Sequence, residues 1–295
     1  FKKKTTNQPI MVELNKSILL QATSEHKGCY RTPHVNDKIY LQYKSITKIA
    51  NLEEYTGLRV IWLQNNGIRV IEGLENQKET RSLYLQNNAI ATIQNLESMQ
   101  DLVRLNLSHN FIKTIEGLDQ CTKLVDLDLS NNNIETIKDV EHLLKLKDSL
   151  QLLDLSHNQI SDPEVIHQII INMKQLKLLK LEGNPVIRKV KFYRKYLIAS
   201  IPSLNCLDNM KIFDRERRTS EAFARGGLEE EREERQKMKD EEEYKKKHQW
   251  DHFDKMVEEH RAAMKTSNDP RASHHDEDEK QTSETFITEG LDSVD

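Results

Sequence analysis

The chain has 295 residues, of which 31% are charged and 6% aromatic, and its formal net charge is −4. This length allows one or two domains, and the small net charge gives no electrostatic reason to expect a nucleic-acid partner. No run of residues is long and apolar enough to span a bilayer, so we expect no membrane partner. The chain begins at Phe1 rather than Met and lacks the apolar core of a signal peptide, so we expect a fragment.

The first segment, residues 1–35, is expected to form an N-terminal helical cap. Between Met11 and Thr23 the apolar residues recur at helical spacing. The pair Thr32-Pro33 would end this helical region, since proline lacks the backbone N–H that a helix needs. The repeats that follow would leave an apolar face at each end of their stack, and a terminal helix would cover one of these faces.

Residues 36–186 repeat one pattern of leucines and isoleucines around an asparagine. The asparagines of the four regular copies are 22 residues apart, and those of the two copies after them follow at intervals of 26 residues. The first copy is degenerate, because a lysine stands in place of the asparagine. This position is held in the seven copies by Lys44, Asn66, Asn88, Asn110, Asn132, Asn158 and Asn184. A period of about 20–29 residues with the form L-x-x-L-x-L-x-x-N is typical of leucine-rich repeats.

Each part of this pattern has a structural role. The L-x-L step turns both leucines to one side, which is typical of a short strand that faces a core. The asparagine amide can bond backbone groups that the following turn would otherwise bury without partners. We therefore expect an α/β solenoid, a curved leucine-rich-repeat horseshoe with a parallel concave sheet through Ile61, Leu83, Leu105 and Leu127. A helix bundle, the alternative for so many leucines, would give the asparagine no role.

The longer copies leave room for helical structure on the convex side of the solenoid. Ser161-Asp-Pro-Glu164 has the residues of a helix start, because Asp or Ser caps free N–H groups and Pro suits the first turn. A helix over residues 163–173 would bury Val165, Ile169 and Ile170. Residues 187–213 depart from the repeat, and we expect them to form a C-terminal repeat cap that covers the last copy.

Residues 214–265 differ sharply in composition, and after Gly226-Gly227 they are rich in Glu, Lys, Arg and Gln. The glycines indicate a break or hinge, and the charged residues favour a long exposed helix or coiled coil. An apolar stripe at coiled-coil spacing is formed by Trp250, Phe253, Val257 and Met264. This stripe would dock on a partner helix, with coiled-coil self-association or packing onto the repeats as alternatives. The acidic, Ser/Thr-rich composition of residues 266–295 predicts a disordered tail.

The sequence carries none of the common motifs for catalysis or cofactor binding: it has no Gly-rich phosphate loop, no nucleophile elbow and no zinc spacing. His248 and His252 are four residues apart, but polar histidines on a charged helix are ordinarily solvated. Cys29, Cys121 and Cys206 form no C-x-x-C pair, and we expect reduced structural thiols in a cytosolic protein. We therefore expect no enzyme, no metal site and no cofactor.

The concave face of the sheet is the best candidate for a functional surface, because the middle residue of each L-x-L step points away from the core onto this face. The seven middle residues are Tyr40, Trp62, Tyr84, Asn106, Asp128, Asp154 and Lys180. Two residues further on lie Gln42, Gln64, Gln86, Ser108, Ser130, Ser156 and Glu182. Aromatic side chains are typical hot spots of protein interfaces. We expect Trp62→Ala to weaken partner binding while leaving thermal unfolding nearly unchanged.

Several stretches carry a resemblance more specific than the repeat. They are Ala50–Arg59 with Trp62-Leu-Gln-Asn-Asn66, Leu155-Ser-His-Asn158 with Ser161-Asp-Pro-Glu164, and Glu221-Ala-Phe-Ala-Arg-Gly-Gly227. These stretches resemble the axonemal dynein assembly factors, a family of ciliary leucine-rich-repeat proteins, over most of residues 30–250. The resemblance implies a cytoplasmic scaffold that preassembles dynein arms and is required for cilium assembly and motility. The implied partners are axonemal dynein chains, chaperones and co-chaperones, and the implied location is the cytoplasm and the cilium or axoneme.

The repeat itself resembles a 22-residue leucine-rich-repeat subclass that a phosphatase regulatory subunit and a spliceosomal protein share with ciliary proteins, so other functions remain open. A regulatory subunit of a protein phosphatase is built on the same repeat, although the charged helix and tail would then be unexplained. A structural component of the axoneme is a further alternative. A spliceosomal RNA-complex component would show steep salt dependence, which the acidic half of the concave face disfavours.

Overall fold

A computed structural model describes residues 12–266 of the chain. These residues divide into two compact units, one that ends at Glu231 and one that begins at Arg232, and each is treated by itself. The first unit contains the repeats, and the second contains most of the charged helix. The tail expected over residues 266–295 lies, apart from Thr266, outside the described residues.

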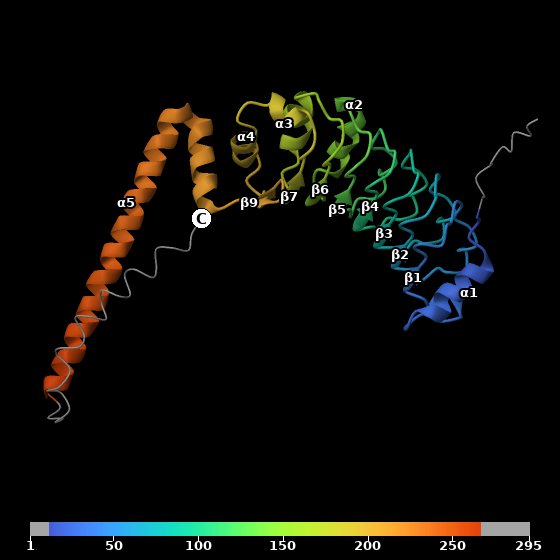
Figure 1. Cartoon of the computed structure of the whole chain (residues 1–295), viewed down its shortest axis with the longest axis horizontal. Helices are drawn as coiled ribbons and strands as arrows, with labels where there is room; N and C mark the ends of the chain where they lie inside the picture. Colours follow the sequence, from blue (N-terminus) through green and yellow to red (C-terminus); the bar gives the residue numbers. More distant parts are fainter. Residues whose placement is uncertain (1–11, 267–295) are drawn as a thin grey trace, which may run out of the picture. The chain divides into compact units, whose positions relative to one another are not determined.

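The first unit is built on one sheet whose strands follow one another in chain order. Within residues 12–266 the strands are β1 (Lys38–Tyr40), β2 (Val60–Trp62), β3 (Ser82–Tyr84), β4 (Arg104–Asn106), β5 (Asp126–Asp128), β6 (Leu152–Asp154), β7 (Leu178–Lys180), β8 (Cys206–Leu207) and β9 (Met210–Lys211). All neighbouring pairs are parallel except β8 and β9. Ile61, Leu83, Leu105 and Leu127 are aligned across β2 to β5. The predicted leucine-rich-repeat solenoid is therefore confirmed (Figure 1).

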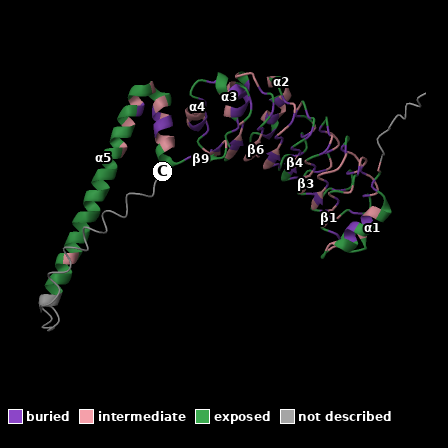
Figure 2. Ribbon diagram, viewed as in Figure 1, coloured by how far each residue is buried: buried purple, intermediate pink, exposed green. Residues whose placement is uncertain are grey.

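The core of this unit lies between the strands and the returning segments of the repeats. The central residue of each strand from β1 to β7 is fully buried, and so are most of the leucines and isoleucines that follow it in each repeat. In Figure 2 these buried positions recur from repeat to repeat along the array. Burying one such side chain contributes about 1.5–3 kcal/mol. No single repeat could cover its own apolar residues, so the stack forms as a whole.

A ladder of asparagines ties each repeat to the one before it. Asn110 Nδ2 donates to the carbonyl oxygens of Leu85 and Leu107 at 3.0 Å each, and its Oδ1 accepts from Ile90 N at 3.0 Å. Equivalent bonds of 2.8–3.1 Å are made by Asn66, Asn88, Asn132, Asn158 and Asn184. The predicted role of the asparagine, satisfying buried backbone groups, is therefore confirmed.

The residue before each ladder asparagine has a left-handed backbone. Asn65, Asn87 and Asn131 have φ between 55° and 57°, and His109 and His157 have φ of 53°. Asparagine and histidine are enriched among non-glycine residues that adopt this conformation. Both histidines are exposed, as expected for residues at the strand edge. Their positions are explained by the turn.

The N-terminal helix α1 (Lys16–Glu25) begins later than the expected residue 11. Residues 12–14 instead run beside the first repeat, where Leu14 N donates to Lys48 O at 2.9 Å. Asn15 then caps the helix, since its side chain accepts from Ile18 N at 3.0 Å. Lys44, which stands in place of a ladder asparagine, pairs with Glu25 at 2.8 Å. The degenerate position of the first repeat therefore anchors the end of α1. A short 3-10 helix, η1 (Pro33–Val35), follows before β1.

The convex side of the later repeats carries short helical turns. These are α2 (Ile137–Val140), the 3-10 helix η2 (Glu141–Leu146), the π-helical turn η3 (Val165–Ile169) and the 3-10 helix η4 (Ile170–Asn172). Instead of the one regular α-helix expected over residues 163–173, the chain forms a wider π-helical turn followed by a tighter 3-10 turn. Val165, Ile169 and Ile170 are buried as predicted, because the apolar pattern needs only a turn that faces the core.

The end of the repeat stack is covered by α3 (Val186–Lys189), α4 (Tyr193–Ser200) and the first part of α5 (Asp214–Thr266). Arg194 contacts Glu216 through two bonds of 2.5 and 2.8 Å, and Arg217 donates to the carbonyls of Ile198 and Leu204. Ala222 is fully buried. The compact unit therefore continues beyond residue 213, where the composition changes, and reaches Glu231.

Two glycines break the regular helix inside α5. Gly226 has φ −146° and Gly227 has φ 73° with ψ −146°, a conformation that is open to glycine and costly for other residues. The sequence prediction of a break at this pair is therefore confirmed. Beyond it Lys195 contacts Glu231 at 2.6 Å, and the Glu231 side chain is 5% exposed.

Candidate protein-binding surface

The concave surface is formed by three columns of side chains that run across the strands. The central column contains the seven residues expected there, Tyr40, Trp62, Tyr84, Asn106, Asp128, Asp154 and Lys180, paired in register from β1 to β7. Each of them is partly exposed. The structure therefore brings these residues together on one surface, and their role in binding remains a proposal.

Three rings of the central column form a continuous stack. The centroids of Tyr40 and Trp62 are 4.4 Å apart with planes inclined by 4°, and those of Trp62 and Tyr84 are 5.8 Å apart with planes inclined by 3°. The faces of Trp62 are therefore directed at the neighbouring tyrosines. Because the rings stack along the array, their edges are what a partner on the concave side would meet. We call Tyr40, Trp62 and Tyr84 the aromatic stack.

Residues from outside the central column hold both ends of the aromatic stack. At one end the ring of His26, just beyond α1, lies 4.3 Å from Tyr40 at an inclination of 37°. At the other end Arg104 donates from Nη1 to the Tyr84 hydroxyl at 3.3 Å and from Nε to Asp126 at 2.7 Å. The Tyr84 hydroxyl and Asp126 raise the pKa of the Arg104 guanidinium. The stack is thus ordered before any partner arrives, which lowers the entropy cost of binding.

A column of glutamines runs beside the aromatic stack. The Oε1 atoms of Gln42, Gln64 and Gln86 are buried and have no hydrogen-bond partner in the described residues. A buried acceptor without a donor costs about 1–3 kcal/mol. A hydrogen bond from a partner protein to any of these three oxygens would remove this cost. New polar contacts would therefore add the most binding free energy on the half of the concave face that carries the glutamines.

The second half of the concave face is bonded within itself. Asp128 Oδ1 accepts from the backbone and hydroxyl of Ser130 at 3.0 and 2.7 Å, and Asp154 makes the same two bonds with Ser156 at 2.9 and 2.6 Å. Lys180 Nζ lies 3.1 Å from Asp154 Oδ2. These carboxylates already have partners within the chain. They are therefore less available for binding another protein than the negative charge of this half of the face suggests. The aromatic half is the stronger candidate site.

The environment of Asp128 makes stability depend on pH. Burial raises the pKa of Asp128, two hydrogen bonds from Ser130 lower it, and the charges of Asp154 and Asp126 raise it, with a net increase. The folded protein therefore binds this proton more tightly than the unfolded chain does. Stability falls as pH rises above the ordinary Asp value of about 4 and stays reduced once the folded pKa is passed.

Asp128→Asn should remove this pH dependence. Asn106 makes the same two bonds with Ser108, at 3.0 and 2.8 Å, so an amide oxygen fits this side of the arrangement. The bond of 3.1 Å from Asn106 Nδ2 to Asp128 Oδ2 would be lost, a cost that does not follow the titration of Asp128. We expect the stability of the variant relative to the parent to rise as pH increases above about 4, until the folded pKa of Asp128 is passed. Thermal unfolding of both proteins across this range provides the measurement. A difference in melting temperature that stays constant with pH would contradict the assignment.

The sequence analysis missed the first column of the concave face. It contains Lys38, Val60, Ser82, Arg104, Asp126, Leu152 and Leu178, which are aligned at the first position of β1 to β7. Strand alternation predicts this column, because a residue two positions before an outward residue also points outward. Arg104 is its most informative member, since it joins the aromatic stack to Asp126.

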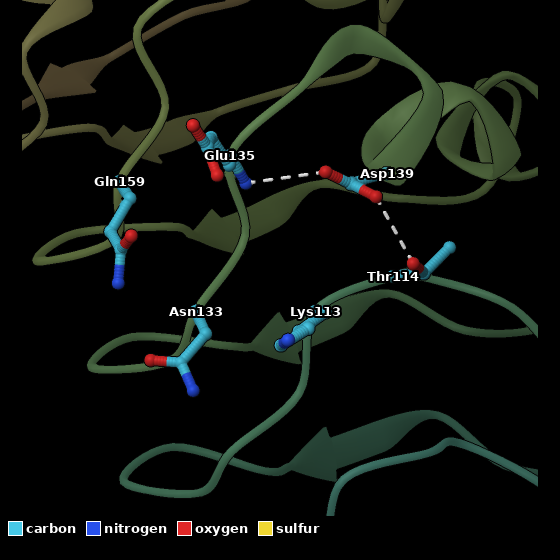
Figure 3. Close-up of a pocket in the computed structure, with 6 residues that line it drawn as sticks. All are labelled: Lys113, Thr114, Asn133, Glu135, Asp139 and Gln159. Atoms are coloured by element: carbon cyan, nitrogen blue, oxygen red, sulfur yellow. Dashed lines mark hydrogen bonds between the residues drawn. The ribbon is translucent and has the colours of Figure 1, made fainter.

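A shallow polar pocket of about 430 Å³ lies away from these columns (Figure 3). It is lined by Lys113, Thr114, Asn133, Glu135, Asp139 and Gln159. Asp139 accepts from the Thr114 hydroxyl at 3.1 Å and from Thr136 N at 2.8 Å. Burial alone would raise the pKa of Asp139, but hydrogen bonds led by those from Thr136 lower it overall. Asp139 is thus held in place as a capping group at the start of α2.

The structure also bears on the metal sites, membrane spans and cysteines considered in the sequence analysis. Within residues 12–266 no group of three His, Cys, Asp or Glu is placed to hold a metal ion, and no helix there is long and apolar enough to cross a membrane. The three cysteines are free, and burial raises the pKa of the Cys121 thiol to about 11.

The partner-helix residues Trp250, Phe253 and Val257 lie on the second unit, where the first two are exposed. The side chain of Met264 lies outside the described residues.

Comparisons with known proteins agree on the repeat. The family model described as leucine-rich repeat matches residues 74–236. Human dynein axonemal assembly factor 1 is 63% identical over 225 residues, covering 76% of this chain and 30% of that protein. Leucine-rich repeat-containing protein ODA7 of Chlamydomonas reinhardtii is 51% identical over 230 residues, covering 78% of this chain and 52% of the relative. The chain spans about a third to a half of the length of these two relatives.

Among solved structures, an internalin from Listeria monocytogenes aligns with a TM-score of 0.48 at 24% identity, over 59% of this chain and 48% of that chain.

Proposed function

The chain belongs to the leucine-rich repeat family, and on that premise we propose that it acts in the assembly of axonemal dyneins as a protein-binding scaffold. The proposal is supported by relatives at 51–63% identity whose names contain dynein axonemal assembly factor or ODA7. The aligned part covers 76% of this chain at the higher identity. Because the chain spans only part of these relatives, the proposal concerns the repeat unit and the charged helix.

The observation that carries the binding role is the aromatic stack. Three parallel rings held by His26 and Arg104 make a rigid surface, and aromatic side chains with little freedom to lose are favourable interface residues. The unpaired Gln42, Gln64 and Gln86 oxygens lie beside the rings. We propose that this half of the concave face binds an extended segment of a partner protein, whose N–H groups would meet the glutamine oxygens after a small side-chain movement.

The proposed scaffold is not an enzyme. The carboxylates in the central column of the concave face are bonded to neighbouring groups, as Asp128 is with Ser130 and Asp154 with Lys180. A general base or nucleophile needs a free acceptor directed at a substrate. These geometries favour recognition of a polypeptide over its chemical change.

The finer proposal is that the protein acts in the cytoplasm, where dynein arms are preassembled before delivery to the axoneme. Its partners would be axonemal dynein chains together with chaperones and co-chaperones. A rigid surface joined to a charged helix suits this role, because two separate surfaces can hold two different proteins at once. Location in the cilium or axoneme would follow if the scaffold accompanies its cargo.

Cells that lack the protein provide the test. They are complemented with the parent, with Trp62→Ala, or with Phe111→Ala, which removes another exposed aromatic ring outside the three concave columns. We expect the parent and Phe111→Ala to restore axonemal dynein arms, seen by electron microscopy, and to co-purify with dynein chains. Trp62→Ala should reduce this recovery by about tenfold or more. Normal dynein arms in the uncomplemented cells would rule out the proposed function.

The structure revises the expected thermal behaviour of Trp62→Ala. The sequence analysis predicted nearly unchanged unfolding, but Trp62 packs between two rings. Each aromatic pair is worth about 0.5–1.5 kcal/mol, so the melting temperature should fall by several degrees. Binding is therefore compared well below the melting temperature, after circular dichroism shows that the variant is folded.

A further inference from the structure

The second unit, residues 232–266 of α5, carries an apolar patch on an otherwise charged helix. Trp250, Phe253 and Met256 are 59%, 53% and 50% exposed, and Val257 is partly exposed. The rings of Trp250 and Phe253 meet edge to face, with centroids 6.4 Å apart. Exposed apolar side chains gathered on one face mark an interaction surface. At about 100° per residue these four side chains occupy roughly a third of the helix circumference.

The patch is too short for a long parallel coiled coil. Continuing the stripe toward the N-terminus at heptad spacing meets Lys246 and Glu243, both charged and exposed. A sustained coiled coil needs about three to four apolar heptads. The patch therefore suits a short contact in which the aromatic residues supply most of the burial.

Four of the exposed charges around the patch favour one particular partner, and the exposed Asp251 and Asp254 on one edge oppose it. Lys245 and Lys247 precede it and Glu258 and Glu259 follow it, and all four are exposed. By helical geometry Lys247 and Glu258 flank one edge of the patch, while Lys245 and Glu259 flank the other. The midpoint of both pairs falls at residues 252–253. Two copies related by a two-fold axis at this point would place each lysine against a glutamate of the other copy.

We propose that two copies of this chain associate antiparallel through residues 245–259 of α5. Trp250 and Phe253 of each copy pack against their counterparts, and Lys247–Glu258 and Lys245–Glu259 pairs between copies lie along the two edges. In an antiparallel pair related by a two-fold axis, each edge of the patch faces the same edge of the other copy, so Lys247 meets Glu258 and Lys245 meets Glu259. A parallel pair in register would bring the lysines of both copies together, which is unfavourable. The dimer would present two repeat units from one assembly, a consequence independent of the proposed function.

Sedimentation equilibrium of the whole chain between about 1 and 200 µM tests the association. We expect a monomer–dimer equilibrium that Trp250→Ala and Phe253→Ala each weaken by about tenfold or more. Tyr244→Ala removes a 67% exposed ring from a different face of the same helix and serves as the matched control. It should change the dissociation constant less than about twofold. A chain that stays monomeric over the whole range would overturn the proposal and leave the patch to a different protein.

Charge exchange tests the orientation. Lys247→Glu or Glu258→Lys alone should weaken the dimer, and the two together should restore it, because the pair between copies is re-formed with its charges exchanged. Crosslinking gives a second readout: a mixture of Lys247→Cys and Glu258→Cys chains should form a disulfide faster than either chain alone. The parent, with its three native cysteines, provides the background. Failure of the double exchange to restore association, or faster bonding between identical variants, would overturn the antiparallel arrangement.

Discussion

Replacing Asn110 with alanine is expected to lower the free energy of unfolding by about 4 kcal/mol. Its amide donates to the carbonyls of Leu85 and Leu107, and its Oδ1 accepts from Ile90 N, each at 3.0 Å. All three bonds are buried, so alanine leaves one N–H and two carbonyls with fewer partners and no access to water. Each such group costs about 1–3 kcal/mol. The side chain itself is only 5% exposed, so its loss also leaves a void.

Urea unfolding followed by circular dichroism measures this effect. Asn76→Ala is the matched control, because Asn76 is exposed and makes one surface bond of 3.3 Å to the carbonyl of Glu53. We expect the control to change stability by less than about 1 kcal/mol. If Asn110→Ala were no more harmful than Asn76→Ala, the ladder would not be holding adjacent repeats together. A lower m-value in Asn110→Ala would indicate that the array no longer unfolds as one unit.

The second large effect concerns where the repeat unit ends. A chain that stops after Phe213 should be less stable by about 3–5 kcal/mol than one that stops after Gln236. The shorter chain loses the Arg194–Glu216 pair, the two carbonyl contacts of Arg217 and the fully buried Ala222. It also loses the contact between the rings of Phe192 and Phe223, 4.7 Å apart. Terminal repeats need such a cover over their apolar face.

Thermal and urea unfolding of the two truncated chains and the full chain provide the comparison. The chain ending at Gln236 keeps every residue of the first unit, so its stability should match that of the full chain. A point variant separates capping from chain length: Arg217→Ala in the full chain should reproduce about half of the loss, because two buried carbonyls lose their donor. Equal stability of the chains ending at 213 and 236 would show that residues 214–231 add nothing to the repeat unit.

The repeat architecture could be predicted from the sequence because its causes are local and recur. Leu105 and Leu127 are inward because L-x-L alternates, and Asn110 and Asn132 bond the backbone because the same turn follows each strand. The register of the sheet then follows from the 22-residue period. The central concave column could be read from Tyr40 to Lys180 for the same reason. The glycine break in α5 was equally readable, since it depends on two residues alone.

Contacts between distant side chains could not be predicted in this way. That Trp62 packs between two rings depends on how adjacent repeats are spaced in three dimensions. That Asp154 is paired with Ser156 and Lys180 depends on rotamers that one strand position does not determine. The sequence analysis therefore overstated how exposed Trp62 is. It also overstated how free the carboxylates on the second half of the concave face are to bind a partner.

By itself, the sequence determined which residues face the core, because burial follows the period of the pattern. It also determined that an asparagine closes the turn of every repeat after the first. The tertiary structure alone decided how residues far apart along the chain meet. It placed His26 on Tyr40, Arg104 between Tyr84 and Asp126, and Arg217 on the carbonyls of Ile198 and Leu204 in the C-terminal cap. The physical reason is that each of these contacts depends on the packing of whole elements. Composition does not reveal this packing: it changes at Phe213, yet Thr219, Ser220 and Ala222 beyond that residue are buried.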